Sequence, residues 1–336
     1  MRAFAIDKYG TALHAMERPD PVVGQHDVLV EIHAASVNKL DLKIASGELK
    51  QILRYPMPLT LGHDLAGTVI KVGVKVTRFA AGDAVYARPR DGRIGTFAER
   101  IAVAEDDLAL APLSVSAAEA ASLPLVALTA WQALVERGKV RPAQKVLIHA
   151  GAGGVGSIAI PLAKHLGASV ATTASAKNAD LVRSLGADTV IDYRTEDFEQ
   201  HLSGYDLVLD SLGGHNLEKS LRVLRPEGKA IGISDPPTPD FARSAGLPLP
   251  VRLGVAALSA KVRRQAKRLG VTYEFLFMYP SGQQLASIAE LVDAGAIRPL
   301  VGETFDFDQT PNAMTALEHG GLVGKVVVTR GRPTPS

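Results

Sequence analysis

The sequence lacks cysteine, a large net charge and long apolar runs. Without cysteine, the chain of 336 residues forms no disulfide bond and offers no thiolate to a metal ion. Its net charge of +2 gives no sign of a nucleic-acid-binding protein. No apolar run is long enough to span a bilayer, and the N-terminal MRAFAIDKYG has no signal-peptide core. We therefore expect a cytoplasmic protein with no nucleic-acid or membrane partner.

The chain is long enough for two domains, and 46% of its residues are apolar. Its first hundred residues are short, strand-like segments between glycine, proline and aspartate turns, and the alternation over residues 28–32 indicates a half-buried sheet. From Lys145 onward, strands and helices alternate, which predicts an α/β, doubly wound parallel sheet. The predicted strands are 2–6, 28–34, 65–72, 84–87, 96–103, 145–150, 168–174, 189–193, 205–210, 229–234 and 273–278.

Helix signals fill the spaces between these strands. A capping-box sequence opens a helix at Ser116, and a second helix over 125–137 ends at Gly138. The insert 237–270 is proline-rich and loop-like in its first half. Its second half has an apolar helical seam, and we interpret the lysines and arginines there as a solvated basic face. The remaining predicted helices are 157–166, 178–185, 283–294 and 312–319.

The segment Lys145–Gly156 reads KVLIHAGAGGVG, a strand that leads into glycines 151, 153 and 156. In this G-x-G-x-x-G pattern, glycines let the backbone turn tightly and approach a pyrophosphate at a helix N-terminus. A hexapeptide of this kind is also compatible with a plain turn. Here a helix and a second strand follow within about thirty residues, as a βαβ unit requires, and Pro161 is expected near the first turns of that helix. The context favours a dinucleotide site.

The end of the second strand bears on which dinucleotide binds. NAD-specific folds place an Asp or Glu there, on the ribose 2′-hydroxyl, and its charge repels a 2′-phosphate. This strand runs into Ser175, Ala176 and Lys177 without an acid. Ser175 offers a hydrogen bond to a phosphate and Lys177 offers charge, although Lys177 is also a normal exposed helix-start lysine. The pattern predicts NADPH in preference to NADH.

Several ordered blocks carry a resemblance that covers nearly the whole chain. They are Asn38–Asp41 (NKLD), Leu61–Gly67 (LGHDLAG), Gly82–Tyr86 (GDAVY), Gly95–Glu99 (GTFAE), Leu123–Pro124, the AGAGGVG turn and Gly324–Val328 (GKVVV). The chain resembles a zinc-independent member of the medium-chain dehydrogenase/reductase superfamily, in particular its quinone oxidoreductase and alkenal reductase-like branch. The resemblance implies a GroES-like, mostly β catalytic domain over 1–122, a Rossmann domain over 123–279 and a return to the catalytic domain over 280–336. It also implies a homodimer, usually formed through an exposed sheet edge.

The resemblance extends the set of cofactor-binding residues. Thr129 matches a family threonine near the nicotinamide, and Tyr193 resembles the tyrosine that reaches the 2′-phosphate. Other candidates lie at predicted strand ends, where the apolar ones are equally consistent with core packing. The full set is Thr129, Gly151, Ala152, Gly153, Gly154, Val155, Ser175, Lys177, Tyr193, Ser211, Leu212, Ile233, Phe275, Leu276, Phe277 and Lys325.

Reduction without a metal is the chemistry that this sequence favours. Asn38 resembles the first zinc-ligand position of the zinc-dependent relatives, and His63 resembles their histidine. A lone histidine does not make a metal site, so we expect no metal and a structural His63. Hydride transfer from NADPH to an electrophilic quinone or α,β-unsaturated carbonyl compound needs a donor for the developing charge on oxygen. Asn38 is the candidate donor, Asp41 is expected to orient the site, and Tyr55 either donates a proton or merely packs.

Two alternatives stay open. The first is an enoyl-thioester reductase, which an open channel beside the insert 237–270 would favour. The second is a non-catalytic NADPH-binding sensor or structural protein.

Overall fold

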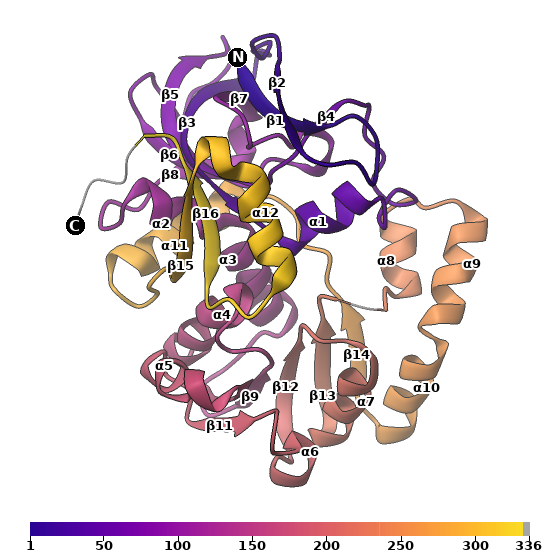
Figure 1. Ribbon diagram of the computed structural model, residues 1–336. Coiled ribbons are helices and arrows are strands. Elements are labelled where there is room, and N and C mark those ends of the chain that lie inside the picture. The colour runs from indigo at the N-terminus through magenta and orange to yellow at the C-terminus, as the bar shows by residue number, and fades with distance from the viewer. Residues whose placement is uncertain (235, 332–336) are drawn as a thin grey trace. The chain divides into compact units, whose positions relative to one another are not determined.

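The computed structural model describes residues 1–234 and 236–331 (Figure 1). The remaining residues, 235 in the predicted Rossmann domain and 332–336 in the predicted return segment, lie outside this description. The chain divides into unit 1, which is Met1–Leu128 with Tyr279–Ser336, and unit 2, which is Thr129–Met278.

Unit 1 contains two sheets. The larger has the strand order β15-β16-β3-β5-β6-β8, with β7 also paired to β3, and the smaller has the order β2-β1-β4. Most neighbours are antiparallel, whereas β15 and β16 are parallel. The strands are β1 (Arg2–Ile6), β2 (His14–Glu17), β3 (Asp27–Val37), β4 (Leu59–Thr60), β5 (Asp64–Val72), β6 (Ala84–Ala87), β7 (Arg100–Ala104), β8 (Leu108–Leu110), β15 (Val301–Asp306) and β16 (Lys325–Thr329).

The predicted alternation on β3 is confirmed. Val28, Val30 and Ile32 are buried in the core of unit 1, while Leu29 and Glu31 between them are half-buried. The period of two in the sequence therefore marks the face of the sheet that packs inward.

The strand predicted over 96–103 begins later than expected, at Arg100. The preceding backbone is used elsewhere, because the N–H groups of Gly95 and Thr96 both donate to the carbonyl of Gly62, at 3.0 and 3.2 Å. These hydrogen bonds connect the two loops and place Thr96 beside Gly62.

Helices at both ends of the chain complete unit 1. The Ser116 cap is confirmed, since its Oγ accepts from the N–H of Glu119 while the Glu119 carboxylate accepts from the N–H of Ser116. The helices are α1 (Lys39–Ser46), α2 (Ala117–Ala121), α11 (Gly282–Asp293) and α12 (Thr310–His319), with the short 3₁₀ turns η1 (Asp91–Arg93), η2 (Glu105–Asp107) and η5 (Phe307–Gln309).

The helix α3 (Pro124–Trp131) contains the division between the units. At its start, the N–H of Leu125 donates to Oδ1 of Asp64 at 2.8 Å, which ties this turn to unit 1. The helix continues as the π-helical segment η3 (Gln132–Arg137) and ends at Gly138, the predicted stop.

Unit 2 is built on a parallel sheet with the strand order β11-β10-β9-β12-β13-β14. This is the order 3-2-1-4-5-6 of a Rossmann fold, with the order reversing at β9. The predicted doubly wound parallel sheet is therefore confirmed, beside a separate, mostly β unit. The strands are β9 (Lys145–Ile148), β10 (Ser169–Ala174), β11 (Thr189–Asp192), β12 (Tyr205–Asp210), β13 (Leu224–Gly232) and β14 (Thr272–Phe275).

The helices of unit 2 differ from expectation at one proline. Pro161 lies in the interior of α4 rather than near its first turns. Proline has no N–H, so the carbonyl four residues earlier receives no helical hydrogen bond from it. No local sequence pattern indicates that the helix continues through this proline. The helices are α4 (Gly154–His165), α5 (Ala179–Ser184), α6 (Phe198–His201), α7 (Gly214–Val223), α8 (Pro239–Ser244), α9 (Leu249–Leu258) and α10 (Ala260–Leu269), with the 3₁₀ turn η4 (Ala176–Asn178).

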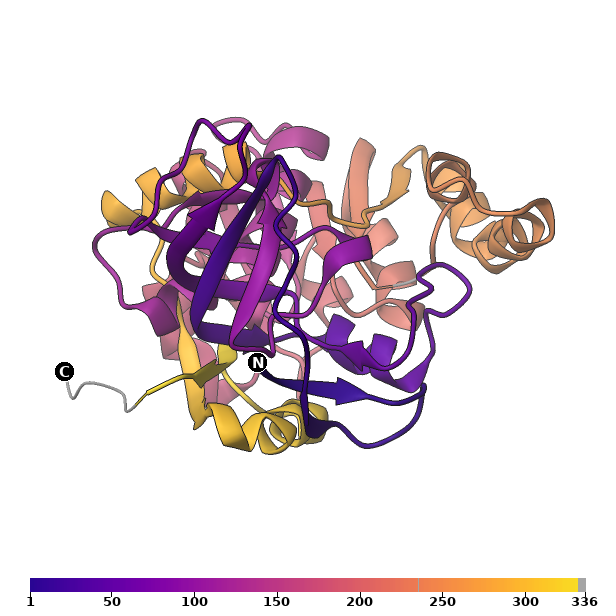
Figure 2. The ribbon, with the colours of Figure 1, turned by 90° about the horizontal axis from the view of Figure 1, so that it is seen from above.

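The insert is helical throughout most of its length. Its first half, expected to be loop, contains α8, which begins with Thr238 as a side-chain cap and Pro239 in the first turn. Figure 2 shows these helices beside β14 at one edge of the parallel sheet. The predicted seam is only partly correct, because Val255, Val262 and Ala266 are buried whereas Leu258 is 70% exposed.

Candidate functional site

In unit 2, the glycine turn connects β9 to α4 with its helix terminus uncapped. Ala150 has φ 53°, and the N-cap residue Gly153 makes no side-chain hydrogen bond to the first turn of α4. The first N–H groups of a helix have no partner within the helix, and their partial positive charge attracts anions. This terminus is the expected cradle for a pyrophosphate.

The three motif glycines have different steric surroundings. A Cβ added to Gly151 would lie 2.3 Å from Thr172 Oγ1, and one added to Gly156 would lie 2.4 Å from the carbonyl oxygen of Ala150. A Cβ on Gly153 would meet only that same carbonyl, at 3.2 Å. Gly151 and Gly156 are thus required by the fold itself, whereas Gly153 leaves backbone open to a ligand. These are the roles that a dinucleotide site needs.

Behind this turn, a buried chain of polar side chains joins three strand ends. His149 follows β9, and its Nδ1 lies 3.1 Å from Thr173 Oγ1, which also accepts from the N–H of Ala150. Its Nε2 lies 2.9 Å from Ser220 Oγ, which donates to Asp210. Oδ1 of Asp210 accepts from the N–H groups of Leu212 and Gly213.

This chain fixes the glycine turn and the loop after β12 as one rigid edge. Burial lowers the pKa of His149, and the Asp210 carboxylate opposes that shift. The imidazole is therefore held neutral, with hydroxyl partners at both nitrogens. His149 was not among the predicted site residues, although it lies at the end of a strand directly before a glycine turn.

The end of β10 has the predicted character. Ser175 is buried at the strand end, Lys177 is exposed, and no acid lies between them. The neighbouring strand β11 ends beside Ala174 and leads to Tyr193, which is exposed. The guanidinium of Arg194 lies 5.8 Å from the Tyr193 ring centre, so a further cation accompanies the predicted residues. Sequence reasoning missed Arg194, although its charge next to Tyr193 was the available signal.

The other candidates in unit 2 fall into two classes. Ser211, Leu212 and Ile233 follow β12 and β13 directly, at the carboxyl edge of the sheet. The candidates after the sixth strand are more enclosed: Leu276 is buried, and the rings of Phe275 and Phe277 pack on Phe241 of α8, at 5.1 and 5.6 Å. Thr129, in α3, is also buried.

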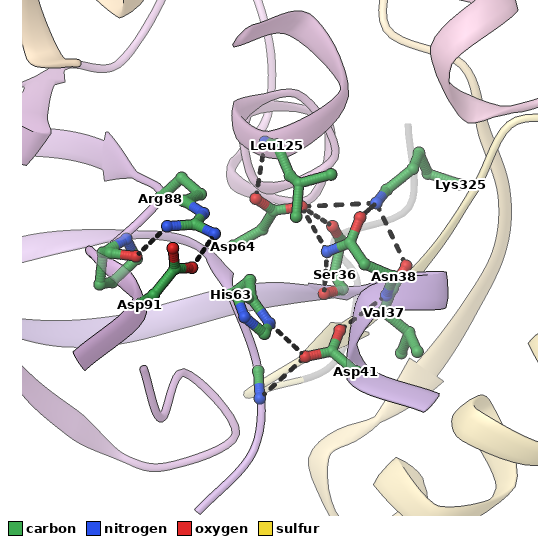
Figure 3. A network of polar contacts seen from close by, with 12 residues as sticks. Ser36, Val37, Asn38, Asp41, His63, Asp64, Arg88, Asp91, Leu125 and Lys325 are labelled. Atoms are coloured by element: carbon green, nitrogen blue, oxygen red, sulfur yellow. Dashed lines mark hydrogen bonds and ion pairs between the residues drawn. The ribbon is translucent and has the colours of Figure 1, made fainter. Parts of the chain in front are cut away.

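In unit 1, Asn38, Asp64 and Lys325 form a buried network (Figure 3). Asn38 Nδ2 donates to Asp64 Oδ2 at 2.9 Å and to the carbonyl of Ser36 at 3.4 Å. The Lys325 ammonium donates to Asn38 Oδ1, to the Val37 carbonyl at 3.1 Å and to Asp64 Oδ2 at 3.4 Å. Burial lowers the pKa of Lys325, while Asp64 and then Asp41 act in the opposite direction.

The donor hydrogens of Asn38 and Lys325, which were predicted to contact the acceptor and the cofactor, are used within this network. Both amide hydrogens of Asn38 have acceptors within unit 1, and so do the three ammonium hydrogens of Lys325. The structure thus brings Asn38 and Lys325 together as a rigid support. Their predicted contacts with an acceptor and a cofactor stay predictions.

Asp41 organises the neighbouring part of the site. Its Oδ1 accepts from the N–H of Gly62 at 3.2 Å and lies 2.6 Å from His63 Nδ1, while its Oδ2 accepts from the N–H of Asn38 at 2.8 Å. A carboxylate only accepts, so Nδ1 of His63 carries the hydrogen and the ring orientation is set. Asp41 thus fixes the His63 ring, and its predicted part in orienting the active site stays a prediction.

Four buried polar atoms near this point have no hydrogen-bond partner among the described residues. They are Tyr55 Oη, His63 Nε2, Arg88 Nε and Thr96 Oγ1. Burial raises the pKa of the Tyr55 hydroxyl, and the nearby Asp91 charge raises it further. Tyr55 is consequently a weaker acid than an ordinary tyrosine. His63, Arg88 and Thr96 were not selected as site residues, so sequence reasoning missed three members of this group.

The donors around His63 do not fit a zinc ion. The chain has no cysteine, and Asn38 turns its amide toward Asp64. Both oxygens of Asp64 already accept hydrogen bonds, and the Lys325 ammonium lies 3.4 Å away from one of them. A single imidazole nitrogen then remains, whereas a zinc site needs three or four ligands.

Comparisons with known proteins identify the family of the chain. Residues 24–113 match the family described as the alcohol dehydrogenase GroES-like domain, and residues 185–328 match the family described as zinc-binding dehydrogenase. The chain is 36% identical to the mitochondrial NAD(P)H oxidoreductase RTN4IP1 of Danio rerio, covering 98% of this chain and 91% of that protein.

A plant enzyme and a solved bacterial structure are also similar. The chloroplastic NADPH-dependent alkenal/one oxidoreductase of Arabidopsis thaliana is 34% identical, over 92% of this chain and 73% of that protein. The quinone oxidoreductase of Coxiella burnetii superposes with a TM-score of 0.85 at 30% identity, covering 98% and 99% of the two chains. The protein is therefore an oxidoreductase that belongs to the medium-chain dehydrogenase/reductase superfamily, in its quinone oxidoreductase and alkenal reductase-like branch.

Proposed function

We propose that this oxidoreductase uses NADPH to reduce quinones or α,β-unsaturated carbonyl compounds. The observation that carries the proposal is the acid-free end of β10, where Ser175 and Lys177 lie at the position that discriminates a 2′-phosphate from a 2′-hydroxyl. Relatives named as an NAD(P)H oxidoreductase and an NADPH-dependent alkenal/one oxidoreductase support it.

On the cofactor side, each group has a separate task. The open N–H groups at the start of α4 would hold the pyrophosphate, and Gly153 leaves the backbone there uncovered. The Ser175 hydroxyl would donate a hydrogen bond to the 2′-phosphate, and Lys177 and Arg194 would supply positive charge. When bound, the reduced nicotinamide supplies a hydride ion.

On the acceptor side, a hydride adds two electrons and leaves negative charge on the acceptor oxygen, which then takes a proton. His63 is the residue that we propose to serve this oxygen, because its Nε2 is buried and has no partner among the described residues. Asp41 orients the ring through Nδ1, and the proton that the acceptor oxygen takes would come from Nε2. Asn38 and Lys325 hold the adjacent carboxylate of Asp64 in place.

The assay that tests this function measures NADPH and NADH oxidation with a panel of quinones, enals, enones and enoyl thioesters. We expect turnover with the quinones or the unsaturated carbonyls, at a higher kcat/KM with NADPH. Turnover restricted to enoyl thioesters would favour the alternative reductase. Tight NADPH binding without any turnover would favour a sensor, and equal kcat/KM values with both cofactors would refute the roles of Ser175 and Lys177. We also propose a homodimer, for which β11 and β14 are the two edge strands of the described parallel sheet.

A further inference from the structure

The helical insert has a charge distribution unlike that of the whole chain. The insert 237–270 contains seven lysines and arginines and one acid, Asp240, and residues 241–270 contain no aspartate or glutamate, whereas the net charge of the entire chain is +2. This segment includes α9 and α10, which lie at the β14 edge of unit 2 (Figures 1 and 2).

The helices α9 and α10 share one helical period. The N–H of Ser259 donates to the carbonyl of Val255 at 3.1 Å, and the N–H of Arg263 donates to the carbonyl of Ser259 at 3.0 Å, so the i→i−4 pattern crosses the junction. The Ser259 hydroxyl also donates to the Val255 carbonyl, at 2.9 Å. Because Val255, Val262 and Ala266 are buried on one side, the other side of both helices faces solvent.

We call this solvent side the outer face, defined by Leu249, Leu253, Ala257, Arg264 and Arg268. At 100° per residue, these positions lie within one stripe about 100° wide. Leu249 and Leu253 are both 64% exposed, and the other three residues are also exposed. The outer face is therefore apolar along α9 and basic along α10.

Acidic neighbours neutralise little of this charge. Glu218 of α7 pairs with Lys261, and Asp240 of α8 pairs with Arg243. The guanidinium groups of Arg263 and Arg264 donate to the backbone carbonyls of Ala256 and Ala260. Within the described parts of the chain, no ion pair is formed by the two arginines of the outer face.

We propose that the outer face docks on the surface of an anionic lipid bilayer. Exposed leucines beside clustered lysines and arginines are the features of a helix that lies in the membrane interface, with its apolar side chains at the acyl boundary and its cations near lipid phosphates. No helix in the described parts of the chain is long and apolar enough to cross a membrane. This proposal departs from the expectation of no membrane partner, which considered spanning segments and signal peptides.

Two other partners fit the outer face less well. A second copy of the chain, related by a two-fold axis, would bring like-charged arginines toward each other with no acid in the same segment to pair with them. A nucleic acid would leave the leucines unused, and it finds no exposed aromatic platform here, since Phe241 packs on Phe275 and Phe277.

The test is vesicle flotation with the full-length protein and needs no cofactor, so its result is separate from the reductase activity. Vesicles of phosphatidylcholine with phosphatidylglycerol are compared with pure phosphatidylcholine, at low and high salt. We expect binding to the anionic vesicles only, with affinity falling as salt rises. Neutralising Arg264→Gln and Arg268→Gln together lowers the affinity about 25-fold, at about fivefold per residue.

Matched variants separate the outer face from general surface effects. Leu253→Gln is expected to weaken binding on the order of tenfold, whereas Leu113→Gln, at a residue 92% exposed in unit 1, leaves it unchanged. The exposed pair Lys71→Gln and Lys75→Gln is the charge control. No binding to anionic vesicles at low salt, or equal losses in the face and control variants, overturns the proposal. So does a dimer that Leu253→Gln converts to monomers, or tighter binding to duplex DNA than to vesicles.

Discussion

His63 Nδ1 lies 2.6 Å from Asp41 Oδ1, and neither side chain is exposed. The same carboxylate accepts from the N–H groups of Asn38 and Gly62, so it holds the backbone at the start of α1 and directly before His63. This arrangement leaves Nε2 as the one ring nitrogen free for an acceptor.

Replacing His63 by phenylalanine keeps the volume and removes both ring nitrogens. We expect kcat/KM to fall about 100-fold, as for loss of a general acid, while the Kd of NADPH stays unchanged. Steady-state kinetics and fluorescence titration measure the two quantities. An unchanged kcat/KM in a folded variant would return His63 to the structural role expected from the sequence.

The Lys325→Met variant tests the network around Asp64. Removing the ammonium leaves a buried carboxylate with an uncompensated charge, so we expect the free energy of unfolding to fall by about 3–5 kcal/mol. Urea denaturation provides the measurement, with Lys39→Met at an exposed position as the control. Adding Asp64→Asn should recover part of the loss, and simple additivity of the two losses would contradict the pairing.

The motif glycines are expected to separate folding from cofactor binding. Gly153→Ala should fold normally, since its Cβ meets only one carbonyl at 3.2 Å, and should weaken NADPH binding at least about tenfold by blocking the phosphate approach. Gly156→Ala should lower the free energy of unfolding by about 1–3 kcal/mol because its Cβ overlaps backbone. Thermal melts and calorimetric titration distinguish the two, and equal melting losses would contradict the distinction.

An acid introduced at the end of β10 should reverse the cofactor preference. Ser175→Asp places negative charge where the 2′-phosphate is expected, so kcat/KM should fall with NADPH and hold or rise with NADH. Lys177→Ala should weaken NADPH alone. Arg183→Ala, an exposed arginine on α5 that pairs with Asp180, serves as the control. A parallel loss with both cofactors in Ser175→Asp would mean that this residue only packs.

His149 should make the protein less stable in mild acid. Its folded pKa lies below the ordinary value of 6.5, so the unfolded chain binds a proton that the folded chain refuses. The free energy of unfolding has its full value above pH 6.5. It falls as the pH drops below 6.5, by at most about 1.4 kcal/mol per pH unit. Urea denaturation from pH 8 to 5 measures this slope. His149→Gln should reduce this slope by up to the equivalent of one bound proton. An identical slope in the variant would contradict a neutral buried imidazole.

The sequence by itself determined the Rossmann topology and the position of the dinucleotide turn. Period-two and helical patterns, glycine spacing and the Ser116 cap are local signals. Each depends on residues that are close in the sequence, so it can be recognised without the tertiary structure. The same holds for the acid-free end of β10, because Ser175 and Lys177 follow their strand immediately.

Only the tertiary structure decided how distant polar groups are used. Lys325 and Asn38 are 287 positions apart, and no local pattern shows that their hydrogens are consumed by each other and by Asp64. Pairing across such distances depends on which strands the sheet brings together and on the cost of leaving a buried polar atom unsatisfied. The helix α8 is a different case, because its Thr238 cap and its Pro239 start are local signals already present where a loop was expected. The 70% exposure of Leu258 depends on tertiary packing, since the helical period of its segment placed this residue on the apolar seam.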